Sequence, residues 1–367
     1  FSPERMPAGG VTGKVVHLVD LASDDLFSFL AAASSALADA EVEQTIVFVN
    51  TPTLNGFLPR IHASVHVVVT PPARNPLRRW RWALRTFRAE VGRSDTGVVH
   101  LYGPLPSLVG TWVAHRAGVV IASNHSPSGA SLPAWVRGLV PLVRRMAITR
   151  GAPLRAVAAG ASTSEPIHSL AVLERPVNPE LFSLPRNEAR RPLVVTGSHM
   201  GDSNSADLFA QLAVLLGGED LGLAFNWVGH VEDALRVRLK AAQVGVIPVR
   251  SATEWAERLT AGWVYLAPGS SSGALPQLVE AMALGLPCIA VDTAAHRSII
   301  RHGENGYLCH TAEEIVTCIA PLIDSKELRL KIGGAAREEV EQRFGETKFR
   351  ETLFAAYQLP PKASRAA

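Results

Sequence analysis

The fold of this 367-residue chain is decided by one stretch, Leu266-Ala-Pro-Gly-Ser-Ser-Ser-Gly-Ala-Leu-Pro-Gln-Leu-Val-Glu-Ala-Met-Ala-Leu-Gly-Leu-Pro-Cys-Ile-Ala290. We expect a strand to end at Pro268, a loop of glycine and serine to follow, and a helix to begin near Pro276. Free backbone N–H groups and the positive end of the helix dipole suit such a junction to an anion, a pyrophosphate in particular. The alternative is an ordinary strand-to-helix turn that binds nothing.

Outward from this junction, short apolar runs alternate with helical stretches along most of the chain. In the first half, strands are expected at 14–20, 45–49, 65–69, 97–101, 119–123 and 154–159, and helices at 23–39, 76–92, 105–117 and 133–149. In the second half, strands are expected at 193–196, 223–228, 245–249, 263–267 and 288–291, and closing helices at 313–323, 326–344 and 347–357. This alternation is typical of α/β proteins with doubly wound parallel sheets.

The alternation breaks at 173–185, where three prolines occur, Pro176, Pro179 and Pro185. We therefore predict two Rossmann-like domains, the first over residues 1–183 and the second over residues 184–345. A helix over 346–359 follows, and residues 360–367 are expected to form a disordered tail.

Composition excludes several classes of protein. Hydrophobic residues make up 47% of the chain and charged residues 19%, so most of it has enough apolar side chains to fold. No apolar run approaches the ~18 residues that cross a bilayer, and we see no signal peptide. Three cysteines are too few for a disulfide framework and lack the spacing of a zinc site. A cytoplasmic protein without a bound metal is expected.

The net charge of +3 is unevenly distributed. Residues 1–185 carry 17 Lys and Arg against 12 Asp and Glu, whereas residues 186–367 carry 19 against 21. A basic first half is typical of a protein that meets an anionic surface or substrate, although it can also have no function. We find no nucleic-acid-binding module, so nucleic acid is not expected as a partner.

The second part of the quoted stretch, Val279-Glu-Ala-Met-Ala-Leu-Gly-Leu-Pro-Cys-Ile-Ala290, resembles the signature LEAMAxGxPVIA of glycosyltransferase family 4. Further segments resemble that family in the same order along the chain: 98–103, 121–126, 176–182, 293–308, 328–344 and 349–357. The resemblance covers most of the chain. It implies the GT-B fold, in which two doubly wound domains face each other across a cleft and the last helix crosses back to the first domain.

The resemblance also implies roles for individual residues. Glu280 would bind the ribose of a nucleotide-sugar donor, and His125 and Ser272 would lie near the transferred sugar as the catalytic residues. The donor diphosphate would meet two loops, which comprise Gly269, Ser270, Ser271, Gly273, Ala274 and Leu275, and Gly197, Ser198, His199 and Ser203. The acceptor side would comprise His100, Tyr102 and Asn124. The alternatives are a helix-dipole charge for Glu280, a structural role for His125, turn chemistry for 197–203, and packing for the acceptor-side residues.

Two functions remain open on this basis. The first is retaining transfer of a hexose-type sugar, without a metal, from a UDP- or GDP-sugar to a hydroxyl of a polysaccharide, glycolipid or small molecule. The second is a degenerate GT-B protein that binds a nucleotide sugar or a partner without turnover. The second is motivated by Ser272, where the family usually has a glutamate, and by Ser198 and Ser203, where it has arginine and lysine. A nucleotide-sugar epimerase would need an acid/base cluster that we do not find.

The expected helix at 75–93 combines basic and aromatic side chains. Its apolar stripe comprises Leu77, Trp80, Leu84, Phe87 and Val91, and a row of arginines lies beside it: Arg78, Arg81, Arg85 and Arg88. Trp82 lies roughly 170° from the centre of the stripe, on the polar side. A tryptophan among arginines suggests peripheral attachment to an anionic membrane, on its inner face. A solvated helix face is the alternative.

Overall fold

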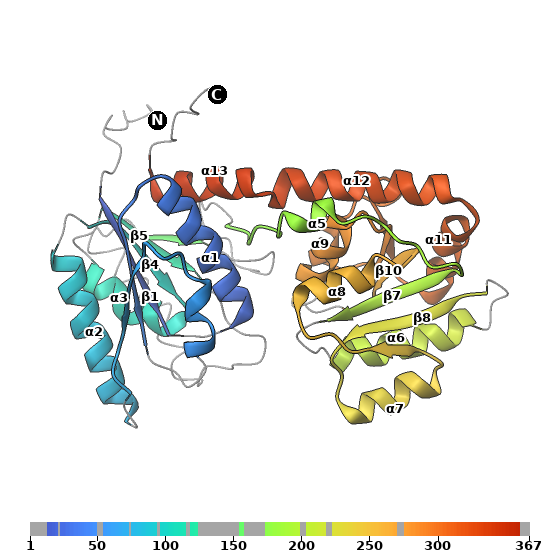
Figure 1. Ribbon diagram of the computed structural model, residues 1–367, viewed down its shortest axis with the longest axis horizontal. Helices are drawn as coiled ribbons and strands as arrows, with labels where there is room; N and C mark the ends of the chain where they lie inside the picture. Colours follow the sequence, from blue (N-terminus) through green and yellow to red (C-terminus); the bar gives the residue numbers. More distant parts are fainter. Residues whose placement is uncertain are drawn as a thin grey trace. The chain divides into compact units, whose positions relative to one another are not determined.

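A computed structural model describes residues 13–20, 23–49, 54–72, 75–93, 96–114, 118–123, 154–157, 173–198, 203–217, 222–269 and 275–359. The chain divides into two compact units (Figure 1). Unit 1 comprises Phe1–Pro176 together with Glu346–Ala367, and unit 2 comprises Val177–Gly345.

Unit 1 contains a parallel sheet whose described strands follow the order β3-β2-β1-β4-β5-β6. These strands are β1 (Lys14–Val19), β2 (Gln44–Phe48), β3 (His66–Val69), β4 (Thr96–Tyr102), β5 (Val119–Ser123) and β6 (Leu154–Val157). Its described helices are α1 (Asp24–Asp39), α2 (Pro76–Arg93), α3 (Pro104–Val113) and α13 (Glu346–Tyr357), with short 3₁₀ turns at Leu54–Gly56 and Leu58–Arg60. α1 and α13 pack on one face of the sheet, and α2 packs on the other. The predicted cap of α1 is present, because Ser23 Oγ accepts a hydrogen bond from the Leu26 N–H at 3.3 Å.

Unit 2 contains a second parallel sheet, in the order β12-β11-β10-β7-β8-β9. Its strands are β7 (Leu193–Ser198), β8 (Ala224–Gly229), β9 (Gly245–Ile247), β10 (Val264–Ala267), β11 (Cys288–Val291) and β12 (Tyr307–Cys309). Its described helices are α5 (Glu180–Ser183), α6 (Ser203–Gly217), α7 (Asp233–Ala241), α8 (Ala252–Leu259), α9 (Leu275–Ala283), α10 (Ala294–Arg297), α11 (Ala312–Asp324) and α12 (Lys326–Phe344).

Helices cover both faces of this second sheet. α8, α9 and α12 share one buried cluster with the strands, and α6, α7 and α11 share the other. The predicted fold class of two doubly wound domains is therefore confirmed. β12 was not expected from the sequence; its three residues pair with β11 at one edge of the sheet.

The boundary between the units lies earlier in the chain than the sequence analysis placed it, because residues 177–183 belong to unit 2. The Val177 N–H donates to the Phe344 carbonyl at 2.9 Å, and Val177 and Leu181 are buried in the core of unit 2. The chain thus enters unit 2 beside the residue at which α12 ends.

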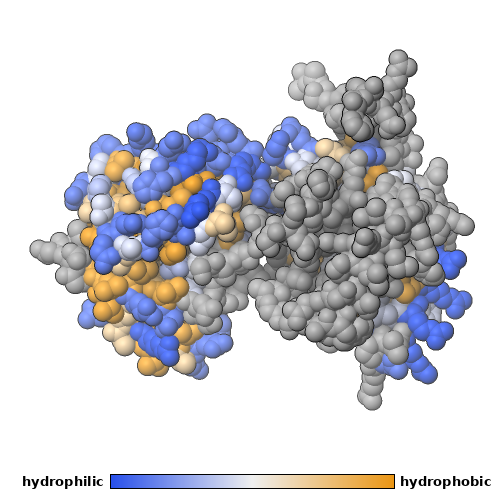
Figure 2. Space-filling view, turned by 180° about the vertical axis from the view of Figure 1, so that it is seen from behind, coloured by the Kyte–Doolittle hydropathy of each residue, from blue (hydrophilic) through white to orange (hydrophobic). Residues whose placement is uncertain are grey.

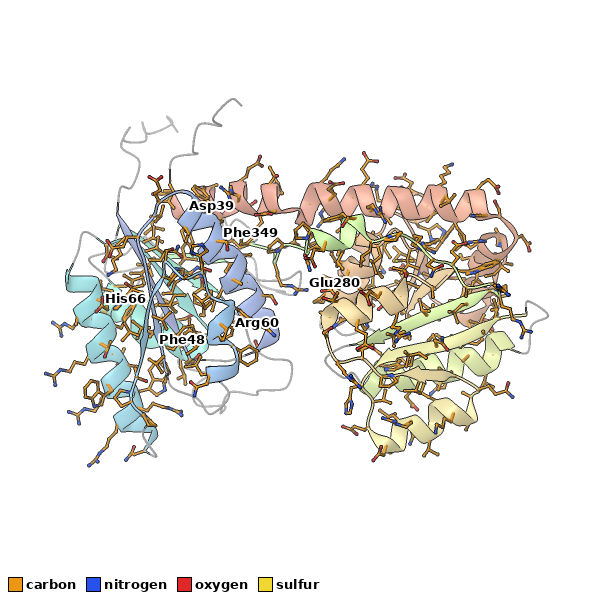
Figure 3. The ribbon with its side chains drawn as sticks, in the orientation of Figure 1. Asp39, Phe48, Arg60, His66, Glu280 and Phe349 are labelled. Carbon is orange, nitrogen blue, oxygen red and sulfur yellow. The ribbon has the colours of Figure 1, made fainter. Side chains whose placement is uncertain are left out.

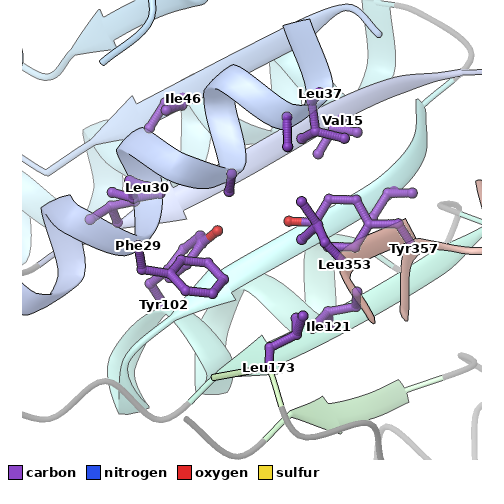
Figure 4. Close-up of a cluster of buried hydrophobic side chains, with 14 of the residues drawn as sticks. Val15, Phe29, Leu30, Leu37, Ile46, Tyr102, Ile121, Leu173, Leu353 and Tyr357 are labelled. Carbon is purple, nitrogen blue, oxygen red and sulfur yellow. The ribbon is translucent and has the colours of Figure 1, made fainter. Parts of the chain in front are cut away.

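The last helix, α13, completes the core of unit 1. Phe349, Leu353 and Tyr357 of this helix are buried in one cluster with residues of β1, β4, β5 and α1. Figure 4 shows Leu353 and Tyr357 in this cluster, which also includes Ile121 and Leu173. An ion pair between Arg350 and Asp39 ties α13 to α1 at the surface. Among the described residues, no helix is long and apolar enough to cross a bilayer.

Candidate functional site

The candidate donor site of unit 2 lies where the strand order reverses, between β7 and β10. The two strands are neighbours, with Val264 opposite Val194 and Tyr265 opposite Val195. Their carboxyl ends therefore bring together the beginnings of the two loops that the sequence analysis assigned to the diphosphate. Ligands of open α/β sheets bind at such a switch point, in the crevice beyond the carboxyl ends of the strands.

The structure describes the residues that flank these two loops but not the central residues of either loop. Gly269 and Leu275 are buried at either side of the β10–α9 loop. Outside the described residues lie Ser270, Ser271, Ser272, Gly273, Ala274 and His199; the structure describes the backbone but not the side chains of Ser198 and Ser203.

Gly197, which the sequence analysis assigned to the diphosphate loop, is also required by packing. Its φ is +153°, and a Cβ at this position would lie 1.8 Å from the Val228 carbonyl oxygen of β8. A larger residue would push β7 away from β8 at the switch point. Close backbone approach is thus one reason for glycine here.

Glu280 lies on α9, the helix that follows the β10 loop (Figure 3). Only 8% of the residue is exposed, although α9 begins at the carboxyl edge of the sheet. Glu280 lies in the second turn of α9, just beyond the carboxyl end of β10, where ligands of open α/β sheets bind, and a carboxylate can accept hydrogen bonds from hydroxyl groups. The location therefore suits a group that binds a diol.

α9 ends in a tight contact with α12 that explains the second half of the signature. Gly285 has a φ of +72°, the left-handed conformation that ends helices. A Cβ on Gly333 of α12 would lie 2.1 Å from the Gly285 carbonyl oxygen, so both positions need glycine. The contact positions α9, and therefore Glu280, against the core of unit 2.

In unit 1 the strand order reverses between β1 and β4. Asp20 follows β1 directly, and Tyr102 ends β4 beside it. Asp20 Oδ1 is buried and has no hydrogen-bond partner among the described residues. Burial raises the pKa of Asp20 to about 7, against the opposing effects of a backbone hydrogen bond and the positive charge of Arg79. A buried carboxyl group with one unpartnered oxygen at this edge is a candidate ligand-binding group.

Asp20 was not among the site residues expected from the sequence. A signal for Asp20 in the sequence is its position directly after the first strand. In a doubly wound sheet this position lies at the switch point, but only once the strand order is known. The strand order cannot be derived from hydrophobic periodicity alone.

His100 and Tyr102, which were expected on the acceptor side, are fully buried in the core of unit 1. His100 Nδ1 lies 2.7 Å from Tyr357 Oη, and Tyr102 Oη lies 3.0 Å from His17 Nδ1. The His100 and Tyr102 rings stack with centroids 4.0 Å apart. These contacts favour the packing role that was the alternative. Asn124 and His125 follow β5 and lie outside the described residues.

Burial shapes the ionisation of this aromatic cluster. It raises the pKa values of Tyr102 and Tyr357 and lowers that of His17 to about 3, so these three side chains are neutral at physiological pH. Among the described residues, no group of three or more His, Cys, Asp or Glu side chains could hold a metal ion.

The fold is that of the GT-B class of glycosyltransferases, and comparison with known proteins agrees with this class. Residues 231–339 match the family model described as glycosyl transferases group 1, a range that includes α9 and Glu280. The chain is similar to the sulfoquinovosyl transferase SQD2 of Arabidopsis thaliana, with 27% identity over 181 residues, or 47% of this chain and 35% of that protein. It spans between about a fifth and about a third of the length of the curated relatives it matches.

Solved structures are similar in fold over nearly the whole chain. A glycosyltransferase from Rickettsia africae aligns with a TM-score of 0.73 and 13% identity, over 94% of this chain and 97% of that one. HepE from Anabaena in complex with UDP-glucose aligns with a TM-score of 0.65 and 14% identity, over 94% and 98%.

Proposed function

We propose that this protein transfers a hexose-type sugar from a nucleotide-sugar donor, a UDP- or GDP-sugar, to an acceptor hydroxyl. The observation that carries this proposal is the buried Glu280 on α9, at the switch point of unit 2 and within the region that matches glycosyl transferases group 1. Bound UDP-glucose in the HepE structure supports a nucleotide-sugar donor.

In this proposal the ribose hydroxyls donate hydrogen bonds to Glu280, and the diphosphate meets the loops that follow β7 and β10. The backbone N–H groups at the start of α9 would stabilise the diphosphate as it departs, because the helix dipole favours negative charge there. His125 and Ser272 remain the residues that we assign to the transferred sugar.

We infer that the reaction retains the configuration of the sugar, as the resemblance to family 4 implies. The acceptor oxygen forms a bond to the anomeric carbon on the face from which the diphosphate oxygen leaves. The acceptor's proton passes to the departing diphosphate, so no nucleophile of the protein is required. The acceptor remains one of three kinds of hydroxyl compound: a polysaccharide, a glycolipid or a small molecule.

On the acceptor side, Asp20 takes the place of His100 and Tyr102 in the proposal. Its unpartnered Oδ1 can accept a hydrogen bond from an acceptor hydroxyl, whereas the polar atoms of the two aromatic residues are engaged inside the core. Asn124 stays a predicted acceptor-side residue.

The ribose role is tested by titrating UDP into the native chain and into Glu280→Gln. The glutamine has the same shape but accepts weaker hydrogen bonds, so we expect affinity to fall by about 5- to 150-fold, a loss of about 1–3 kcal/mol. Glu257→Gln on α8 is the matched control, because Glu257 is exposed, and its affinity should equal that of the native chain. An unchanged dissociation constant for Glu280→Gln with a native unfolding midpoint would refute the ribose role.

Transfer itself is tested with a panel of UDP-, GDP-, ADP- and TDP-sugars, with NMR of the product's anomeric proton. We expect turnover with one donor and retention of configuration. If the protein binds a nucleotide but shows neither sugar transfer nor donor hydrolysis, the result would instead support the degenerate GT-B protein. The serines at 198, 203 and 272 favour that alternative.

A further inference from the structure

α2 has one face anchored in unit 1 and an opposite face whose side chains are exposed. Ala83, Phe87 and Val91 are buried against the sheet with residues of β1, β2 and β4. The outward face comprises Arg78, Arg81, Trp82, Arg85 and Arg88, all exposed, and we call it the α2 basic face. Figure 2 shows hydrophilic side chains at the position of α2, near the right edge of that view.

The positive charge of this face is not neutralised within the described part of the chain. α2 contains six arginines and one acidic residue, Glu90. Glu90 is buried and accepts a hydrogen bond from Lys14 Nζ at 3.3 Å, so it does not offset the arginines. None of the four arginines of the basic face forms an ion pair with a described residue. Four positive charges therefore lie along roughly 15 Å of one helix.

Trp82 is the unusual member of the face. Its residue is 53% exposed, while Trp80 on the same helix is half-buried against the core of unit 1. An exposed indole costs free energy in water, whereas at a membrane interface the ring enters the headgroup region and its N–H stays hydrated. Arginines on either side of the ring can reach lipid phosphates with their flexible side chains.

We propose that the α2 basic face docks unit 1 on the surface of an anionic phospholipid bilayer. A straight row of cations with one aromatic ring fits a flat, negatively charged surface. Single-stranded nucleic acid would instead be expected in a positively charged groove with several stacking rings. This proposal goes beyond the proposed function and does not depend on it, because it concerns only the described side chains of α2.

The test is co-sedimentation of the full chain with phosphatidylcholine vesicles that contain, or lack, phosphatidylglycerol. We expect binding only to the anionic vesicles, and weaker binding as salt shortens the Debye length from roughly 10 Å at 0.1 M. Arg81→Glu/Arg85→Glu should weaken binding at least tenfold. Trp82→Ala should weaken it several-fold at both low and high salt, because burial of the ring is not screened.

A charge-matched control tests whether vesicle binding depends on the α2 basic face or only on the net charge of the chain. Arg190→Glu/Arg191→Glu changes the net charge by the same amount on exposed residues of unit 2, and its binding should equal that of the native chain. Both double variants should keep the native unfolding midpoint, since none of these arginines has a described partner.

Three results would overturn the proposal: no sedimentation of the native chain with anionic vesicles at low salt, equal loss in the two double variants, or displacement of the vesicles by a single-stranded oligonucleotide that binds the same face more tightly.

Discussion

Asp20 in unit 1 and Glu280 in unit 2 are acidic side chains held largely out of water near the carboxyl edges of their sheets. For Asp20 the consequence is a carboxyl group whose pKa is raised from 3.8 to about 7. The unfolded chain loses this proton at a lower pH than the folded chain does. The free energy of unfolding therefore falls as the pH rises between about 4 and about 7, and the loss is complete above that range. Such a cost is typical of binding sites, where stability is given up for function.

We expect Asp20→Asn to be as stable as the native chain near the acid end of this range and more stable by about 2 kcal/mol at about pH 8. The asparagine cannot ionise, so it keeps the stability that the protonated aspartic acid has. Thermal unfolding midpoints measured across the pH range check this. Asp233→Asn, a fully exposed position in unit 2, serves as the control and should show no pH-dependent difference. Parallel pH profiles for the native chain and Asp20→Asn would contradict the raised pKa.

At the scale of elements, α13 is the part of unit 1 that is most distant in sequence from the rest. Tyr357 is fully buried, and its Oη hydrogen-bonds His100 Nδ1 across 257 residues of chain. Phe349 packs edge-on against Phe29 of α1, with ring centroids 5.4 Å apart. α13 therefore contributes side chains to the buried cluster on the face of the first sheet that α1 also covers.

Tyr357→Phe should destabilise unit 1 by about 1–2 kcal/mol, because it removes the buried hydrogen bond between Tyr357 Oη and His100 Nδ1. Tyr357→Ala should cost about 3–5 kcal/mol, because it also leaves a cavity. Lys348→Ala on the exposed side of the same helix is the control and should change stability by less than about 0.5 kcal/mol. Urea unfolding of the three variants gives these values. Equal stability of Tyr357→Ala and the native chain would show that α13 does not contribute to the core of unit 1.

At the scale of the whole molecule, each unit has its own buried clusters on the two faces of its own sheet. The candidate donor residues on β7, β10 and α9 belong to unit 2. A nucleotide that binds there stabilises the folded state of the unit to which it is attached.

We therefore expect UDP at about 100 times its dissociation constant to slow hydrogen exchange of the core amides of unit 2 by about 100-fold, equivalent to about 2.7 kcal/mol. Core amides of β1 and β2 in unit 1 should exchange at an unchanged rate. The same experiment on Glu280→Gln at the same UDP concentration should show less slowing. Equal slowing in both units would mean that they unfold together, contrary to the expectation.

The sequence by itself determined the positions of most helices and strands, because these depend on local interactions. The alternation of apolar runs and helical stretches located both sheets, and the Ser23 cap located the start of α1. The Gly-Ser junction and the signature after it located the β10–α9 turn and Glu280. The helical period alone placed Trp82 away from the core, where it is exposed. Each of these features depends on residues a few positions apart, so a single sequence is enough to show them.

Only the tertiary structure decided which of these residues lie together. Strand order placed Asp20 at the switch point of unit 1, and buried contacts placed His100 and Tyr102 inside the core. The pairing of Val177 with Phe344 moved the boundary between the units, and pairing with β11 defined β12. All of these depend on contacts between residues far apart in the chain, which leave no periodic signal in the sequence. Whether a histidine or tyrosine at a strand end packs or binds depends on which helix returns to cover it.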